Sequence, residues 1–167
     1  MIIKVIANTI ASSIEKRVQG LSDYIHHPKQ TRSHHLSNYI HQLHPGSGQD
    51  FLAEKCMYSN SRNFLDDDPD QQKIEMSQTA SLNSRVTDPI QHIVGSFKKF
   101  EVPTTEQIEE QIDILVKHLG AEDLQMQYAM HLDTDNVHFH LILNKVHPFK
   151  KISSMKIKSS IWVRVGF

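Results

Sequence analysis

Three histidines, His131, His138 and His140, lie within ten residues toward the end of the chain. Residues 137–146 alternate between apolar and polar types, which is typical of a strand with one buried face. His138 and His140 would then share a face, about 7 Å apart at a rise of ~3.3 Å per residue. The turn-forming segment 133–136 predicts a hairpin that folds His131 back beside them. Three neutral imidazoles on one patch predict a divalent-metal site with open coordination positions.

Residues 131–148 closely resemble the third motif of conjugative relaxases, the mobilization nucleases of the MOBP type within the HUH endonuclease superfamily. Segments 61–76 and 88–107 resemble further parts of the same family, in the expected order. The resemblance covers most of residues 1–28 and 56–148, and several ordered motifs make it specific.

The resemblance implies a relaxase that nicks one DNA strand by tyrosine transesterification at a transfer origin. This step would initiate conjugative transfer of a plasmid or an integrative element. The implied nucleophile is Tyr24, near the end of the first helix, with Tyr39 as the alternative. A phosphotyrosyl ester suits this chemistry because it retains the bond energy needed for religation. The implied cofactor is a divalent ion, Mg²⁺ or Mn²⁺, held by the three histidines.

Other site residues follow from the same comparison. Asp133 is expected to orient a ligand imidazole or to help take the tyrosine proton. Ser96 matches the second motif of the family, which implies a DNA contact near the cut. Arg62 and Lys145 are candidate phosphate contacts. The implied partners are single-stranded or melted origin DNA, accessory relaxosome proteins and the coupling protein of a type IV secretion system.

Two other functions remain open at this point. One is a remnant of a relaxase that binds DNA or metal without cutting. The other is a rolling-circle replication initiator endonuclease with the same HUH chemistry. The order of the motifs argues against the initiator, because such enzymes place the tyrosine after the histidine motif and here Tyr24 precedes it.

Length and composition exclude only a few broad classes of protein. A chain of 167 residues predicts one domain with a sizeable core. The net charge of −1 predicts local rather than global attraction to DNA. The single cysteine, Cys56, excludes an internal disulfide and a cysteine metal cage. No apolar run reaches ~18 residues, so we expect no membrane insertion and a cytoplasmic protein.

The predicted fold is α+β, with a central antiparallel sheet and flanking helices, as in HUH relaxases. Strands are expected at 2–7, 89–97, 124–132 and 137–146, and helices at 15–25 and 69–83 and after Pro103. Thr104 and Gln107 form a capping box for the last helix, and Gly120 is its C-terminal stop. Ser12 or Ser13 caps the first helix.

Several local expectations concern side chains. Tyr128 alternates with apolar residues and is predicted to be structural. Residues 59–69 are polar and rich in turn formers, and Tyr58 is expected in this turn region without a partner. Ile74 and Met76 are expected to be at best partly buried in their helix.

The domain is expected to span residues 1–148, with 26–55 as a flexible insertion and 149–167 as a divergent tail. The resemblance fades after Pro148, where the chain becomes basic and rich in strand formers. We therefore expect a chain that is truncated or out of register at its C-terminus, with impaired activity.

Overall fold

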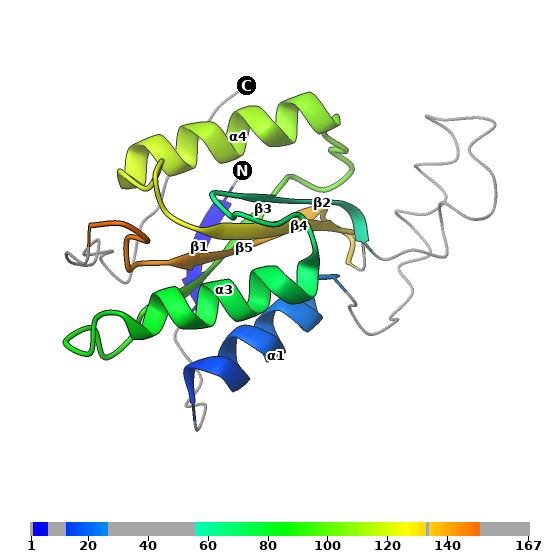
Figure 1. Cartoon of the computed structure of the whole chain (residues 1–167). Helices are drawn as coiled ribbons and strands as arrows, with labels where there is room; N and C mark the ends of the chain where they lie inside the picture. The colour runs from blue at the N-terminus through cyan, green and yellow to red at the C-terminus, as the bar shows by residue number, and fades with distance from the viewer. Residues whose placement is uncertain (1, 7–12, 27–55, 133, 151–167) are drawn as a thin grey trace.

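The computed structural model describes residues 2–6, 13–26, 56–132 and 134–150. These residues form a five-stranded antiparallel sheet, in the order β1-β3-β5-β4-β2, between helices on both faces (Figure 1). The predicted α+β class is therefore confirmed. The elements are β1 (Ile2–Ile6), α1 (Ile14–His26), β2 (Cys56–Arg62), α3 (Pro69–Ser81), β3 (Ile90–Ser96), α4 (Thr105–Leu119), β4 (Met126–His131) and β5 (His138–Asn144).

The expected flexible insertion lies almost wholly outside the described residues, as does nearly all of the expected tail. The hypothesis of a truncated or misaligned C-terminus concerns that tail. Within the described part of the chain, none of the helices has both the length and the apolar character that a membrane span requires.

Helix α4 covers one face of the sheet. The predicted capping box is present: the Thr104 hydroxyl accepts from the Gln107 backbone, and the Gln107 side chain accepts from the Thr104 backbone. Gly120 ends the helix in the left-handed region, with φ of 63°, where a side chain would be strained. Apolar residues at helical spacing, including Ile108 and Ile112, are buried against the sheet and form the larger core.

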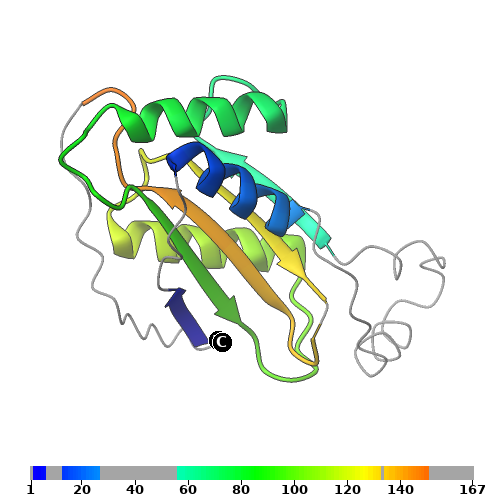
Figure 2. The same ribbon diagram turned by 90° about the horizontal axis from the view of Figure 1, so that it is seen from below.

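Helices α1 and α3 pack together over the other face of the sheet (Figure 2). The Ser13 hydroxyl accepts from the Lys16 backbone, which settles the N-terminal cap of α1 between the two candidate serines. Val18 of α1 and Met76 of α3 are both fully buried in the smaller core. The expectation that Met76 is at best partly buried was wrong, because α3 packs against α1 as well as against the sheet.

The hairpin of β4 and β5 crosses the middle of the sheet. Its predicted alternation is confirmed: Phe139 and Leu141 of β5 lie in the core under α4, whereas Ile142 lies in the core under α1 and α3. Helices cover both faces, so the polar members of the alternation are buried too. His140 and Asn144 therefore lie inside the protein, beneath the helices, rather than on an open surface.

Strand β2 was not expected from the sequence. Residues 58–62 belong to the predicted polar turn region, but they pair with β4 at the edge of the sheet. An edge strand has one partner and a partly exposed face, so its side chains need not be apolar. The polar residues Ser59, Asn60 and Ser61 therefore do not indicate a strand in the sequence, although they form one through their pairing with β4.

Candidate metal and nucleophile site

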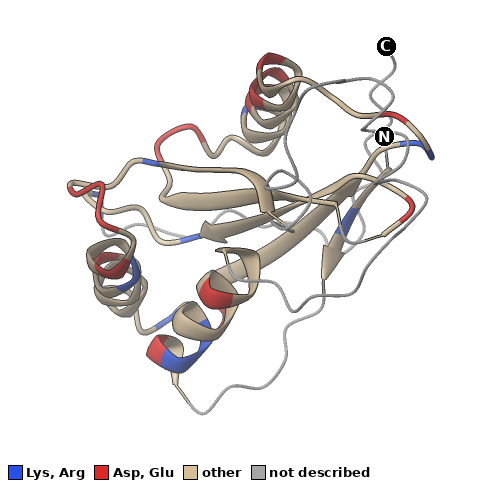
Figure 3. Ribbon diagram, turned by 90° about the vertical axis from the view of Figure 1, so that its right-hand side faces the viewer, with Lys and Arg blue, Asp and Glu red and all other residues tan. Residues whose placement is uncertain are grey.

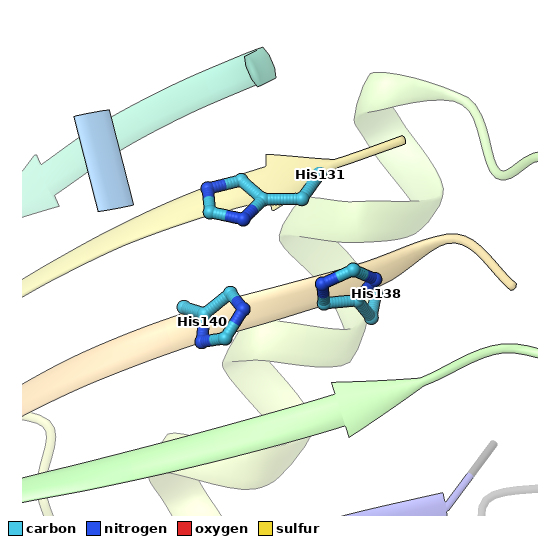
Figure 4. A group of neighbouring side chains, drawn as sticks. All are labelled: His131, His138 and His140. Carbon is cyan, nitrogen blue, oxygen red and sulfur yellow. The ribbon is translucent and has the colours of Figure 1, made fainter. Parts of the chain in front are cut away.

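The predicted histidines converge at the turn end of the central hairpin. His131 is the last residue of β4 and lies directly opposite His138, the first residue of β5. His140 is two residues further along β5 and therefore points to the same face. Figure 4 shows the three imidazoles side by side, one from β4 and two from β5.

The spacing of the three rings fits a single metal ion. Their centroids are 4.7 Å (His131–His140), 5.1 Å (His138–His140) and 5.6 Å (His131–His138) apart. One ring nitrogen from each lies within 4.8 Å of the others. An ion with bonds of about 2.1 Å holds its ligand atoms no more than about 4.2 Å apart, so small ring rotations suffice.

Backbone carbonyls determine which nitrogen of two of these rings carries the proton. His131 Nε2 lies 2.7 Å from the carbonyl oxygen of Ile25 in α1. His138 Nδ1 lies 3.1 Å from the carbonyl oxygen of Asn136 in the hairpin turn. A carbonyl oxygen only accepts, so both nitrogens are N–H donors in the neutral rings. The lone pairs are left on His131 Nδ1 and His138 Nε2.

The environment of His140 favours the neutral imidazole that a metal needs. Burial, together with the neighbouring His131, His92 and His138, lowers the pKa of His140 to about 2. Its Nε2 is buried and has no hydrogen-bond partner within the described part of the chain. A buried nitrogen in that condition, beside two further imidazoles, is the kind of donor a metal ion would use.

Tyr24 lies against this cluster. Its ring makes edge contacts with His140 and His131, with centroids 5.1 and 6.0 Å apart. Helix α1 holds it there, because Ile25 is fully buried and its carbonyl accepts from His131. Tyr24 nevertheless remains 46% exposed, so the ring also borders on solvent. The alternative tyrosine, Tyr39, lies outside the described residues.

Ser96 lies at the same end of the sheet. It pairs with His138 in the β3–β5 register, so the two side chains share a face. Its hydroxyl donates to the Phe97 carbonyl at 3.3 Å. Asp133, which is predicted to orient a ligand imidazole or to help take the tyrosine proton, lies outside the described residues.

Arg62 does not join the histidines. It pairs with Met126, whose side chain lies in the core under α4. Arg62 therefore shares the α4 face of the sheet with Met126, whereas the histidines lie on the other face. Its guanidinium forms ion pairs with Glu109 and Asp113 of α4 and donates to the Tyr128 hydroxyl. These contacts give Arg62 a role in attaching α4 to β2 and β4.

The hydroxyls of Tyr58 and Tyr128 also take part in the contact between Arg62 and α4. Tyr128 and Tyr58 both donate to Glu109, at 2.8 and 2.6 Å. Burial opposes ionisation of Glu109, but the donors around it outweigh burial and hold the pKa of Glu109 below its usual value. Tyr128 is structural, as predicted. Tyr58 has a partner and lies on β2, so its expected place in a turn without one was wrong.

Lys145 is also remote from the histidines. It follows the far end of β5, and its ammonium pairs with Asp88 at 3.2 Å, beside Arg17. Lys99, in the segment after β3, instead pairs with Asp135 of the hairpin turn at 3.2 Å. Figure 3 shows Lys and Arg scattered over several elements, with acidic residues on α4 and before α3.

The sequence reasoning missed one residue of the cluster, His92 of β3. Its Nε2 lies 2.8 Å from Nδ1 of His140, and its ring lies 6.3 Å from that of Tyr24 between centroids. The signal was present: a histidine within a mostly apolar strand is expected to be buried and then needs a polar partner. Its partner is on another strand, so the sequence did not name it.

The chain is similar to one protein family and to several known proteins. The family described as "Relaxase: MobA/VirD2-like, nuclease domain" matches residues 26–162 of the chain. A protein named MobA from Acidithiobacillus ferrooxidans is 45% identical over 75 residues, which is 45% of this chain and 18% of MobA. Two proteins named TraI from Escherichia coli are 36% and 33% identical over 75 residues, 44% of this chain and 10% of each TraI. The alignments thus span less than a fifth of each relative.

Proposed function

Because this chain belongs to the MobA/VirD2-like relaxase nuclease-domain family, we propose that it nicks one strand of DNA at a transfer origin through Tyr24. The single observation that carries the proposal is the contact of the Tyr24 ring with His131 and His140. This contact brings a partly exposed phenol to the edge of the histidine cluster. The nick would initiate conjugative transfer of the DNA element.

In this proposal the Tyr24 oxygen attacks the scissile phosphorus. The bond to the 3′ oxygen breaks, a 5′-phosphotyrosyl ester forms, and the leaving 3′ oxygen takes up a proton. Free tyrosine has a pKa near 10, so a tyrosine nucleophile needs a proton acceptor at neutral pH. Asp133, which neighbours the cluster in sequence, is our candidate for that acceptor.

His131, His138 and His140 would hold the divalent ion, Mg²⁺ or Mn²⁺, because one ring nitrogen of each lies within 4.8 Å of the others. Three imidazoles would leave open positions for water and phosphate oxygens, the ligands that these ions prefer. When bound, the ion supplies Lewis-acid stabilisation of negative charge on the phosphate. Neutral imidazoles leave that ion its full positive charge, which favours an anionic substrate. The Ser96 hydroxyl, on the same face as His138, is our candidate for a DNA contact beside the cut.

The substrate we propose is single-stranded or locally melted DNA, because an intact duplex does not present a phosphate in line with a helix-borne tyrosine. The scattered basic residues predict modest non-specific affinity. Accessory proteins at the origin and the coupling protein of a type IV secretion system would then be required partners. Arg62 and Lys145 are not part of this proposal, since both are engaged in ion pairs away from the cluster.

The test is formation of a covalent DNA adduct. Single-stranded oligonucleotides that tile both strands of the element encoding the chain are incubated with protein and Mn²⁺, then separated under denaturing conditions. We expect an adduct with one oligonucleotide, none with Tyr24→Phe, and an undiminished adduct with Tyr58→Phe. Tyr58 is a matched control because its hydroxyl bonds Glu109 on the other face of the sheet.

Two results would overturn the proposal in different ways. If Tyr24→Phe still forms the adduct while Tyr39→Phe does not, the nucleophile is Tyr39. If the wild-type chain binds an oligonucleotide but forms no adduct with either Mg²⁺ or Mn²⁺, the chain is a binding protein and not a nuclease.

A further inference from the structure

His92 stands beside the three clustered histidines without being one of the candidate ligands. It lies on β3, the green strand next to β5 in Figure 4, and is only 8% exposed. In the β3–β5 register it faces Ile142, so it is diagonal to His140 on the same face of the sheet. Its Nε2 and His140 Nδ1 are 2.8 Å apart, a hydrogen-bond distance between two rings inclined by 28°.

A hydrogen bond between two neutral imidazoles leaves the position of the proton open. His131 and His138 bond to carbonyl oxygens, which only accept, so their donating nitrogens are determined. His140 bonds to another ring, and each ring can donate or accept. The protonation of His140 therefore depends on which nitrogen of His92 carries its proton.

The surroundings of His140 Nε2 distinguish the two arrangements. This nitrogen is buried and has no hydrogen-bond partner among the described residues. A proton there would be an unsatisfied buried donor, whereas a lone pair there is available to a metal ion. His140 therefore carries its proton on Nδ1, and His92 Nε2 accepts the hydrogen bond from this N–H group.

From this geometry we propose that His92 is a positioning residue for the metal centre. His92 Nε2 accepts a hydrogen bond from the Nδ1–H group of His140. This bond fixes the orientation of the His140 ring and keeps the lone pair on His140 Nε2 available to the ion. The role matches that of the Ile25 and Asn136 carbonyls toward the other two histidines. This inference rests on the proposed function, since it presupposes that the cluster binds a metal.

The test replaces His92 in the full 167-residue chain. His92→Phe keeps an aromatic ring but has no acceptor, whereas His92→Gln retains a carbonyl oxygen that can accept from His140. Gln91→Met is the matched control, because Gln91 is also buried on β3 but donates to the backbone carbonyls of Ile6 and His92 and not to a ring of the cluster. We measure Mn²⁺ affinity by calorimetry, thermal unfolding without metal, and the ring ¹⁵N shifts of His140 without metal.

We expect His92→Phe to weaken Mn²⁺ binding by about 10- to 100-fold, which is typical for loss of a partner of a metal ligand. His92→Gln should recover part of the affinity, and Gln91→Met should bind as the wild type does. The ¹⁵N shifts of the wild type should show His140 protonated at Nδ1, and this pattern should be lost in His92→Phe.

Three results would overturn parts of this scheme and can be told apart. Wild-type affinity in His92→Phe, with only a lower melting temperature, would show that His92 is merely structural. A wild-type His140 protonated at Nε2 would refute the inference without any variant, even if His92→Phe does not fold. Failure of the wild-type chain to bind Mn²⁺ would instead refute the metal centre of the proposed function.

Discussion

His138 is the member of the histidine cluster whose removal should least disturb the fold. It begins β5, is only partly buried, and its Nδ1 lies beside the adjacent turn, at Asn136 and Thr134. Its contribution to packing is therefore small, although it supplies one of three clustered ring nitrogens. Replacing His138 therefore tests metal binding with little effect on the stability of the fold.

We predict that His138→Ala abolishes measurable Mn²⁺ binding and metal-dependent nicking. The free energy of unfolding without metal should change by no more than about 0.5 kcal/mol, as for most replacements near the surface. Calorimetry and chemical denaturation measure the two effects. His118→Ala, an exposed histidine on α4, is the control, and a His138→Ala protein that nicks at the wild-type rate would contradict the role.

Arg62 provides the opposite case, a basic residue with a structural function. Its side chain joins β2 to α4 through Glu109, Asp113 and Tyr128. Half-buried charge-assisted bonds of this type are stronger than exposed surface pairs. We predict that Arg62→Gln lowers the free energy of unfolding by about 1–2 kcal/mol.

The same variant should bind single-stranded DNA with unchanged affinity, because Arg62 faces away from the histidines. Fluorescence anisotropy with a labelled oligonucleotide measures this. Lys99→Gln, in the segment beside the hairpin turn, is the comparison and should weaken binding. A DNA-binding defect in Arg62→Gln at full stability would restore Arg62 as a phosphate contact.

Among the elements, β3 and β5 approach closely at one point. Gly95 of β3 lies opposite Phe139 of β5, and a Cβ atom at Gly95 would overlap the ring atoms of Phe139. Phe139 is buried against Phe97 in the core under α4 and has little freedom to move. The absence of a side chain at Gly95 is thus required for the β3–β5 pairing that carries His92, His138 and His140.

We predict that Gly95→Ala lowers the free energy of unfolding by about 1–3 kcal/mol, the usual range for overpacking a core. Gly20→Ala is the matched control, because Gly20 lies inside α1 with open space where the Cβ would be. That change should be neutral or stabilising by up to about 1 kcal/mol. Denaturation curves that show equal effects at both glycines would contradict the close approach.

The two faces of the sheet differ at the level of the whole molecule. The face under α4 is an apolar core with a polar margin at Glu109, whereas the face under α1 and α3 carries buried imidazoles. Burial lowers the pKa of His92 to about 4, helped by the positive charge of Arg17 and by His131. The native protein therefore keeps His92 and His140 neutral well below pH 6.5.

This burial predicts acid sensitivity of the metal-free protein. Above pH 6.5 both histidines are neutral in the folded and unfolded states, and they contribute no pH dependence. Below it the unfolded chain takes up protons that the native protein does not, so stability falls as the pH is lowered toward 4. Each histidine contributes at most about 1.4 kcal/mol per pH unit.

We expect the melting temperature to fall between pH 7 and pH 5, and His92→Gln to reduce the slope. Mn²⁺ should raise the melting temperature at pH 7 more than at pH 5, because protons compete for the ligand nitrogens. Thermal unfolding across this range provides the measurement, with His118→Gln as the control. A melting temperature that does not change from pH 7 to pH 5 would contradict the burial of neutral imidazoles.

Local regularities determined much of this protein from the sequence alone. Alternation along 137–146 placed His138 and His140 on one face, because successive side chains of any strand point to opposite sides. The capping box at Thr104 and the stop at Gly120 defined α4, because both signals act within a few residues. The family resemblance followed from the same local motifs.

Only the tertiary structure decided which strands are neighbours. The pairing of β3 with β5 brings His92 to His140 across 48 positions of the sequence, and the pairing of β2 with β4 turns Arg62 toward α4. Neither contact leaves a periodic signal, because sheet order depends on how helices on both faces bury the whole set of strands. The three clustered histidines were thus predictable one by one, whereas His92, the hydrogen-bond partner of His140, was not.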